Sequence, residues 1–115
     1  MKKLVILVTR EGLGQVDSAD RHFSMEMFDR FLHALESQAA RPVAICFYTD
    51  GVKLVCEGSP AVLGLQLLQG MGVRLLVCRT CLEHFQMTGK TKVGEVRGMN
   101  EIVALLSDAD SVITV

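Results

Sequence analysis

Three short apolar runs constrain the fold of this chain more than any other feature of its sequence. They occupy residues 4–8, 43–48 and 73–77, and none of them alternates between apolar and polar positions. Continuous runs of this length, rich in valine, isoleucine and leucine, are typical of strands that are covered on both faces. We therefore expect three central strands of a largely parallel sheet.

Helical patterns separate these runs. A first helix is expected over residues 19–37, and apolar residues that recur every four positions predict its buried stripe as Phe23, Met27, Phe31 and Leu35. A second helix is expected from Pro60 to about Gln69, because Ser59 is a favourable N-cap residue and proline is tolerated at the first helical position.

The C-terminal third predicts shorter elements. A short strand is expected near residues 92–96, a helix over 100–107 and a last strand over 111–115. Strands that alternate with helices indicate the α/β class, with helices on both sides of a mainly parallel sheet. Because the sequence contains no linker, internal repeat or low-complexity tract, residues 1–115 are expected to form a single domain.

The charge and hydropathy of the chain exclude several kinds of partner. Twelve basic residues nearly balance thirteen acidic ones, so the sequence has no electrostatic signature of binding to nucleic acid or to an anionic membrane. No apolar run is long enough to span a bilayer or to serve as the core of a signal peptide. We therefore expect a cytoplasmic protein, in which the four cysteines remain thiols or take part in redox or sulfur chemistry.

A Cys-x-x-Cys motif lies where the third strand is expected to give way to a helix. Cys78 ends the apolar run, and Cys81 falls in the first turn of the expected helix. Because a helix N-terminus and the intervening Arg79 both favour a thiolate, Cys78 and Cys81 are the candidate catalytic residues. A zinc site would need two more ligands, for which only His84 and Cys56 lie near in the sequence, so neither a metal nor another cofactor is expected.

Other candidate site residues follow the second strand or lie between the two cysteines. Cys56 is expected on the same edge of the sheet, either as a second sulfur carrier, as a resolving thiol or as a packing residue. Asp50 and Gly51 form a predicted turn on that edge. Together with Arg79 and Thr80, these residues are expected to line the pocket. Cys46, inside the second strand, is expected in the core.

Three segments of the chain resemble a known family in the same order. Residues 77–85, VCRTCLEHF, resemble the CGTC-Leu-Asp-Tyr segment of the C-terminal DsrE-like domain of YedF proteins, which are sulfurtransferase-like proteins linked to selenium metabolism. Residues 51–59, GVKLVCEGS, and residues 93–99, VGEVRGM, agree as well. Arg79 departs from this pattern, because YedF proteins have a glycine there. The chain thus resembles the DsrE/DsrF-like family over nearly its whole length.

The resemblance implies both a fold and an activity. The fold would be a three-layer α/β/α sandwich around a mostly parallel five-stranded sheet, in a chain that forms homo-oligomers. The activity would be sulfur relay, in which a cysteine carries sulfur as a persulfide between donor and acceptor proteins such as a TusA-like carrier. The carrier cysteine of the wider family lies just after the third strand, which corresponds to Cys78.

Two alternative functions remain open from the residues themselves. The cysteine pair would also suit a dithiol redox or sensing module that only cycles between thiol and disulfide. A non-catalytic protein that uses the same pocket for a small ligand or for assembly is the third possibility. The sequence alone therefore does not decide whether the chain is an enzyme.

Overall fold

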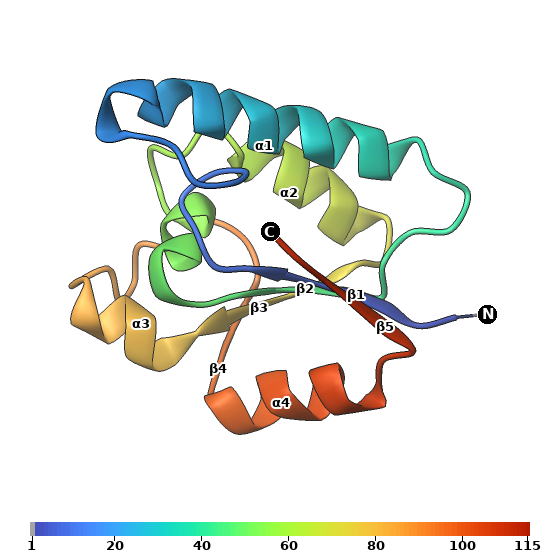
Figure 1. The fold of residues 1–115 in the computed structure, drawn as a ribbon. Coiled ribbons are helices and arrows are strands. Elements are labelled where there is room, and N and C mark those ends of the chain that lie inside the picture. Colours follow the sequence, from blue (N-terminus) through green and yellow to red (C-terminus); the bar gives the residue numbers. More distant parts are fainter. Residues whose placement is uncertain (1) are drawn as a thin grey trace.

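The computed structural model describes residues 2–115 as a five-stranded sheet with helices on both faces (Figure 1). The strand order is β4-β3-β2-β1-β5, and every neighbouring pair is parallel. This confirms the predicted α/β fold with helices on both sides of the sheet. The strands are β1 (Leu4–Val8), β2 (Ala44–Phe47), β3 (Arg74–Cys78), β4 (Glu95–Arg97) and β5 (Ser111–Thr114).

Four α-helices and two 3₁₀ segments complete the fold. Helices α1 (Arg21–Glu36) and α2 (Val62–Gly70) lie together over one face of the sheet, and α4 (Met99–Asp108) lies under the other (Figure 1). The short helix α3 (Arg79–His84) directly follows β3, and the 3₁₀ segments are η1 (Ser18–Asp20) and η2 (Thr49–Val55). None of the helices in residues 2–115 is both long enough and apolar enough to cross a membrane.

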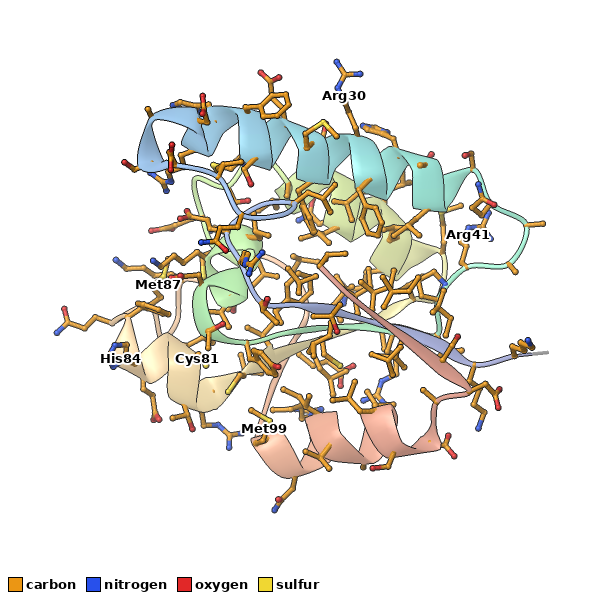
Figure 2. The ribbon with its side chains drawn as sticks, viewed as in Figure 1. Arg30, Arg41, Cys81, His84, Met87 and Met99 are labelled. Atoms are coloured by element: carbon orange, nitrogen blue, oxygen red, sulfur yellow. The ribbon has the colours of Figure 1, made fainter. Side chains whose placement is uncertain are left out.

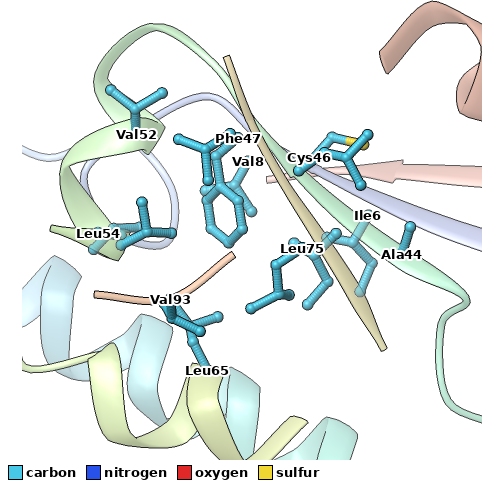
Figure 3. Close-up of a cluster of buried hydrophobic side chains, with 14 of the residues drawn as sticks. Ile6, Val8, Ala44, Cys46, Phe47, Val52, Leu54, Leu65, Leu75 and Val93 are labelled. Atoms are coloured by element: carbon cyan, nitrogen blue, oxygen red, sulfur yellow. The ribbon is translucent and has the colours of Figure 1, made fainter. Parts of the chain in front are cut away.

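The core forms around the three central strands. All four residues of β2 are buried, as are the last four residues of β1 and of β3. Figure 3 shows part of this core, in which Val8 and Phe47 of the strands lie beside Val52 and Leu54 of η2. The absence of alternation in the apolar runs is thus explained, because helices or η2 cover both faces of these strands.

Helix α1 buries a different stripe from the predicted one. The buried residues are Ser24, Phe28 and Leu32, whereas Phe23 is 57% exposed. Ser24 is buried because the loop after β1 packs on it: its hydroxyl donates to the Leu13 carbonyl (3.2 Å) and its carbonyl accepts the Leu13 N–H (3.0 Å). The prediction of Phe23 as a buried residue was therefore wrong, whereas Phe31 and Leu35 of the predicted stripe are partly buried against the core. Ser24 was not predicted, since a serine carries no apolar signal.

The second helix begins later than predicted. Helix α2 starts at Val62, because Ser59 and Pro60 form a turn before it. The Ser59 hydroxyl accepts the Ala61 N–H (3.1 Å), so this serine caps the turn rather than the helix proper. The remaining predicted elements have the expected type, with bounds that differ by up to a few residues.

The ends of β1 and β2 are held together by a very close backbone contact. The Tyr48 N–H donates to the Val8 carbonyl (3.1 Å), and Gly51 packs directly against the same carbonyl. A Cβ atom on Gly51 would lie only 2.2 Å from that oxygen and 2.8 Å from its carbon. Residue 51 therefore has to be glycine for steric reasons, and this contact fixes the start of η2 relative to the sheet.

Replacing Gly51 with alanine should destabilise the protein by about 1–3 kcal/mol, because the added methyl group can be accommodated only by moving backbone. The matched control is Gly70→Ala, since a Cβ at Gly70 meets nothing within 4 Å. That control should leave stability unchanged or raise it by up to about 1 kcal/mol. Urea unfolding of both variants measures the difference, and equal midpoints would contradict the close contact.

Candidate functional site

The two cysteines of the motif lie at the junction of β3 and α3 and differ in exposure. Cys78 is the last residue of β3 and is only 2% exposed, whereas Cys81 in α3 is partly exposed. Both are free thiols, as are Cys46 and Cys56. Figure 2 shows Cys81 at the end of the molecule where His84 and Met87 also lie. The predicted position of the pair, at the carboxyl end of a central strand, is confirmed.

Cys81 accepts a hydrogen bond from a segment that is distant in sequence. The Thr49 N–H, at the start of η2, donates to Cys81 Sγ (3.0 Å). Thr49 has a φ of 49°, which places a β-branched residue in the left-handed region at a cost of about 1–3 kcal/mol. Its hydroxyl, which has a single proton, lies at hydrogen-bond distance from the Thr9 carbonyl just after β1 (2.8 Å) and from the adjacent Tyr48 carbonyl (2.7 Å). Neighbouring structure thus maintains a strained residue whose N–H contacts a thiol.

A second contact joins η2 to α3. The Lys53 ammonium lies 4.3 Å from the centre of the Phe85 ring, directly after α3, and it also pairs with the Asp50 carboxylate (2.9 Å). Cation–π and ion-pair contacts at partly exposed positions are individually weak. Together with the bond from Thr49 to Cys81, they give η2 two separate attachments to α3.

The pKa of the Cys81 thiol differs in direction from the sequence-based expectation. Burial raises this pKa above its usual value, the Thr49 N–H lowers it, and the neighbouring Cys78 thiol raises it again, with a net rise. The expected lowering by a helix N-terminus and by Arg79 is not observed. Helix α3 has only six residues and Arg79 is exposed, so burial is the larger effect.

The other two thiols lie inside the protein. Cys46 is fully buried in β2, where burial raises the pKa of its thiol to about 11. Cys56 is also fully buried, and its thiol donates to the Val52 carbonyl (3.4 Å). Burial, and next the negative charge of Glu57, raise the pKa of Cys56. The expected core position of Cys46 is confirmed, and Cys56 occupies an interior position after η2 rather than an exposed one.

The structure does not bring all of the predicted site residues together around the cysteine pair. Gly51 is buried against β1, and Asp50 is exposed and paired with Lys53. Arg79 and Thr80 are exposed on the first turn of α3. Sequence reasoning missed Thr49, whose backbone N–H donates to Cys81 Sγ. The Asp50-Gly51 turn signal lies next to it, but nothing in the sequence indicates the positive φ.

A cavity of about 570 Å³ lies one helical turn beyond the cysteine pair. Lys53 and Phe85 form part of its wall, whereas neither Cys78 nor Cys81 lines it. Its other lining residues are Glu11, Arg21, Met25, Glu57, Gly58, Ser59 and Met87. Within residues 2–115, no three or more histidine, cysteine, aspartate or glutamate residues are grouped so that they could hold a metal ion.

The fold and the site together define an α/β protein that has a parallel sheet and carries thiols at the carboxyl end of its third strand. The DsrE/DsrF-like family matches residues 3–115, nearly the whole chain. The chain therefore belongs to the DsrE/DsrF-like family. A search of curated proteins gave no significant match.

Several solved structures share the fold of this chain. The ychN protein from E. coli superposes with a TM-score of 0.72 at 18% identity, over 100% of both chains. MTH1491 from Methanobacterium thermoautotrophicum gives a TM-score of 0.69 at 17% identity, again over 100% of both chains. BT1422 from Bacteroides thetaiotaomicron gives 0.63 at 20% identity, over 99% of this chain and 95% of its own. At these identities the likeness shows a common fold.

The four thiols should react with iodoacetamide in an order set by their exposure, with Cys81 first and Cys46 and Cys56 last. Because only the thiolate reacts and burial raises the pKa of Cys81, its rate should rise with pH through a midpoint above that of an ordinary cysteine thiol. Peptide mass spectrometry at several pH values measures each rate. Labelling of Cys56 before Cys81, or a midpoint near neutrality, would contradict this description.

Proposed function

We propose that this chain is a sulfur-relay protein that carries sulfane sulfur as a persulfide on the Cys78–Cys81 pair. The observation that most supports this function is the bond from the Thr49 N–H to the partly exposed Cys81 thiol. A fixed N–H donor at this sulfur stabilises its thiolate, which attacks the donor persulfide and is released again when an acceptor removes the outer sulfur, without reorganisation of solvent. Membership of the DsrE/DsrF-like family adds to this support, because relatives of that family pass sulfur between cysteines.

The transfer step needs only thiols. A thiolate of the pair attacks the terminal sulfur of a donor persulfide, a new S–S bond forms, and the donor leaves as a thiolate when its own S–S bond breaks. An acceptor thiolate then removes the terminal sulfur by the same reaction. No net oxidant or reductant is consumed, since the sulfur atom keeps its oxidation state in both exchanges.

The finer parts of the proposal rest on sequence resemblance. The donor and acceptor would be cytoplasmic proteins such as a TusA-like carrier, and the resemblance to the DsrE-like domain of YedF suggests a link to selenium metabolism. The segments that carry this suggestion are the cysteine motif and residues 51–59 and 93–99.

A dithiol redox or sensing module is the second candidate. The observation that favours it is the proximity of the two thiols, since Cys78 lies close enough to Cys81 to raise its pKa. Oxidation of the pair to a disulfide would remove the thiolate that sulfur transfer requires. Sulfur transfer thus needs a free thiolate in the pair, whereas the redox function converts both thiols to a disulfide. The mass of the protein after the reaction therefore distinguishes the two functions.

Incubation with a small-molecule persulfide donor should add at least one sulfur atom to the wild-type chain, as measured by intact-mass spectrometry. The double variant Cys78→Ala/Cys81→Ser, which keeps Cys46 and Cys56, should add none. Loss of two hydrogens from the wild type, with no sulfur added to either the wild type or Cys78→Ala, would favour the redox module instead. An unchanged mass would contradict both candidates and favour the non-catalytic ligand-binding alternative.

We also propose that the chain forms homo-oligomers through the β5 edge of the sheet. Every residue of β5 is exposed, including Val112 and Ile113, and Val103 of the neighbouring α4 is exposed as well. An edge strand that presents both unpaired backbone groups and apolar side chains is suited to contact a second copy of the chain.

Light scattering after gel filtration should therefore give a mass that is a multiple of 12.6 kDa for the wild type. Ile113→Lys should shift the protein toward monomer, because a charge would be buried at the contact. Leu63→Lys, at an exposed apolar position on α2, is the matched control and should not. Monomeric wild type, or dissociation by the control alone, would contradict the β5 contact.

A further inference from the structure

We propose that Cys81, rather than Cys78, is the thiol that accepts and carries the transferred sulfur, and that the strained backbone of Thr49 supplies the donor for its anion. This assignment rests on the proposed sulfur-relay function and deepens it. It differs from the role that family resemblance gives to the cysteine at the strand end. Three observations carry it: the exposure of the two thiols, the bond to Cys81 Sγ, and the way in which Thr49 is held.

Cys78 and Cys81 differ in solvent exposure. The attacking sulfur must approach the terminal sulfur of the donor persulfide along its S–S bond, which requires an open path to the acceptor thiol. Cys78 is 2% exposed at the end of β3, so the surrounding chain obstructs that path. Cys81 is partly exposed on α3. A protein or small-molecule donor can therefore reach Cys81 without a rearrangement of the sheet edge.

The hydrogen bond from Thr49 reaches Cys81 Sγ, the atom that becomes negatively charged when the thiol ionises. The Thr49 N–H donates to Cys81 Sγ at 3.0 Å, and a backbone N–H can only donate. It therefore favours the thiolate over the thiol. Burial opposes this effect and raises the pKa of Cys81, so near neutral pH the group is mainly a thiol and the donor matters when the proton leaves.

Thr49 is held in place by the ends of the two central strands. Its φ of 49° determines the orientation of the peptide group between Tyr48 and Thr49 relative to the rest of η2. On one side of this peptide the Tyr48 N–H donates to the Val8 carbonyl. On the other side the Thr49 hydroxyl lies 2.8 Å from the Thr9 carbonyl, and Gly51 packs against the Val8 carbonyl, so both sides are attached to the end of β1. A strained conformation maintained by two anchors indicates a donor that is fixed before the reaction.

The same geometry assigns a role to Cys78. After sulfur has been loaded as Cys81–S–SH, the Cys78 thiolate can attack Cys81 Sγ. The persulfide bond then breaks, a disulfide forms between the two cysteines, and the outer sulfur leaves as hydrosulfide, which takes up a proton. Two thiols are oxidised in this step and one sulfane sulfur is reduced to sulfide. Cys78 would thus discharge a persulfide that no acceptor collects.

Site mapping of the loaded sulfur tests the assignment. The wild type, Cys78→Ala and Cys81→Ser are incubated with the same persulfide donor, and circular dichroism checks that each is folded. Loading is expected in the wild type and in Cys78→Ala, on the peptide that contains residue 81, and not in Cys81→Ser. Cys78→Ala should also hold its sulfur longer than the wild type, because the discharge step is lost.

The possible outcomes separate this inference from the function on which it rests. Loading that persists in Cys81→Ser, or that is lost in Cys78→Ala, would overturn the assignment to Cys81 and leave a sulfur carrier in place. Absence of loading in both the wild type and Cys78→Ala would overturn the relay function itself, together with the inference.

The role of Thr49 has its own readout in the pH dependence of Cys81 alkylation. Thr49→Ala removes the hydroxyl anchor to Thr9, so the donor should lose its fixed position and the thiolate should be less favoured. The alkylation rate of Cys81 at pH 7.5 should fall by about threefold to tenfold, and its midpoint should move to higher pH. Thr88→Ala, in the exposed loop after α3, is the matched control and should behave as the wild type. An unchanged profile in Thr49→Ala would overturn the role of Thr49.

Discussion

The contact between Gly51 and the Val8 carbonyl is the constraint on which the site depends. It joins the ends of β1 and β2 so closely that no side chain fits at residue 51, and it thereby fixes where η2 begins. The first residue of η2 is Thr49, whose N–H reaches across to Cys81 on the helix after β3. Three consecutive strands of a parallel sheet thus each contribute a part of the site at their carboxyl ends, as is general for this class of fold.

The four thiols differ in how deeply they are buried, and therefore in how readily they react. Cys46 and Cys56 are inside the protein, and burial raises the pKa of each, which keeps both as inert thiols. Cys78 is nearly as buried, but it adjoins the one thiol that solvent reaches. Reactivity is therefore concentrated at Cys81, and the second thiol of the pair is placed to act on whatever Cys81 carries. This arrangement suits the sulfur carrier with a resolving thiol that we propose.

The sequence predicted the sheet better than the site. The bounds of β1 were correct because an uninterrupted apolar run flanked by polar residues leaves little choice, and the cysteine pair was correctly placed at the end of β3. The stripe of α1 was wrong at Phe23, because it is the neighbouring Ser24 that is buried, where it binds the loop that follows β1. Thr49 was missed, and the pKa of Cys81 was misjudged, since a positive φ and a partly buried thiol both result from contacts between segments far apart in sequence.

The bond from the Thr49 N–H to Cys81 Sγ is most directly tested by an NMR titration of the ¹⁵N-labelled protein between about pH 7 and 10, the range that brackets an ordinary thiol pKa. The account predicts that the Thr49 amide resonance moves as the Cys81 thiol ionises, with the midpoint found by alkylation, and that this movement disappears in Cys81→Ser. A Thr49 amide that does not titrate, or one that titrates equally in Cys81→Ser, would contradict the account.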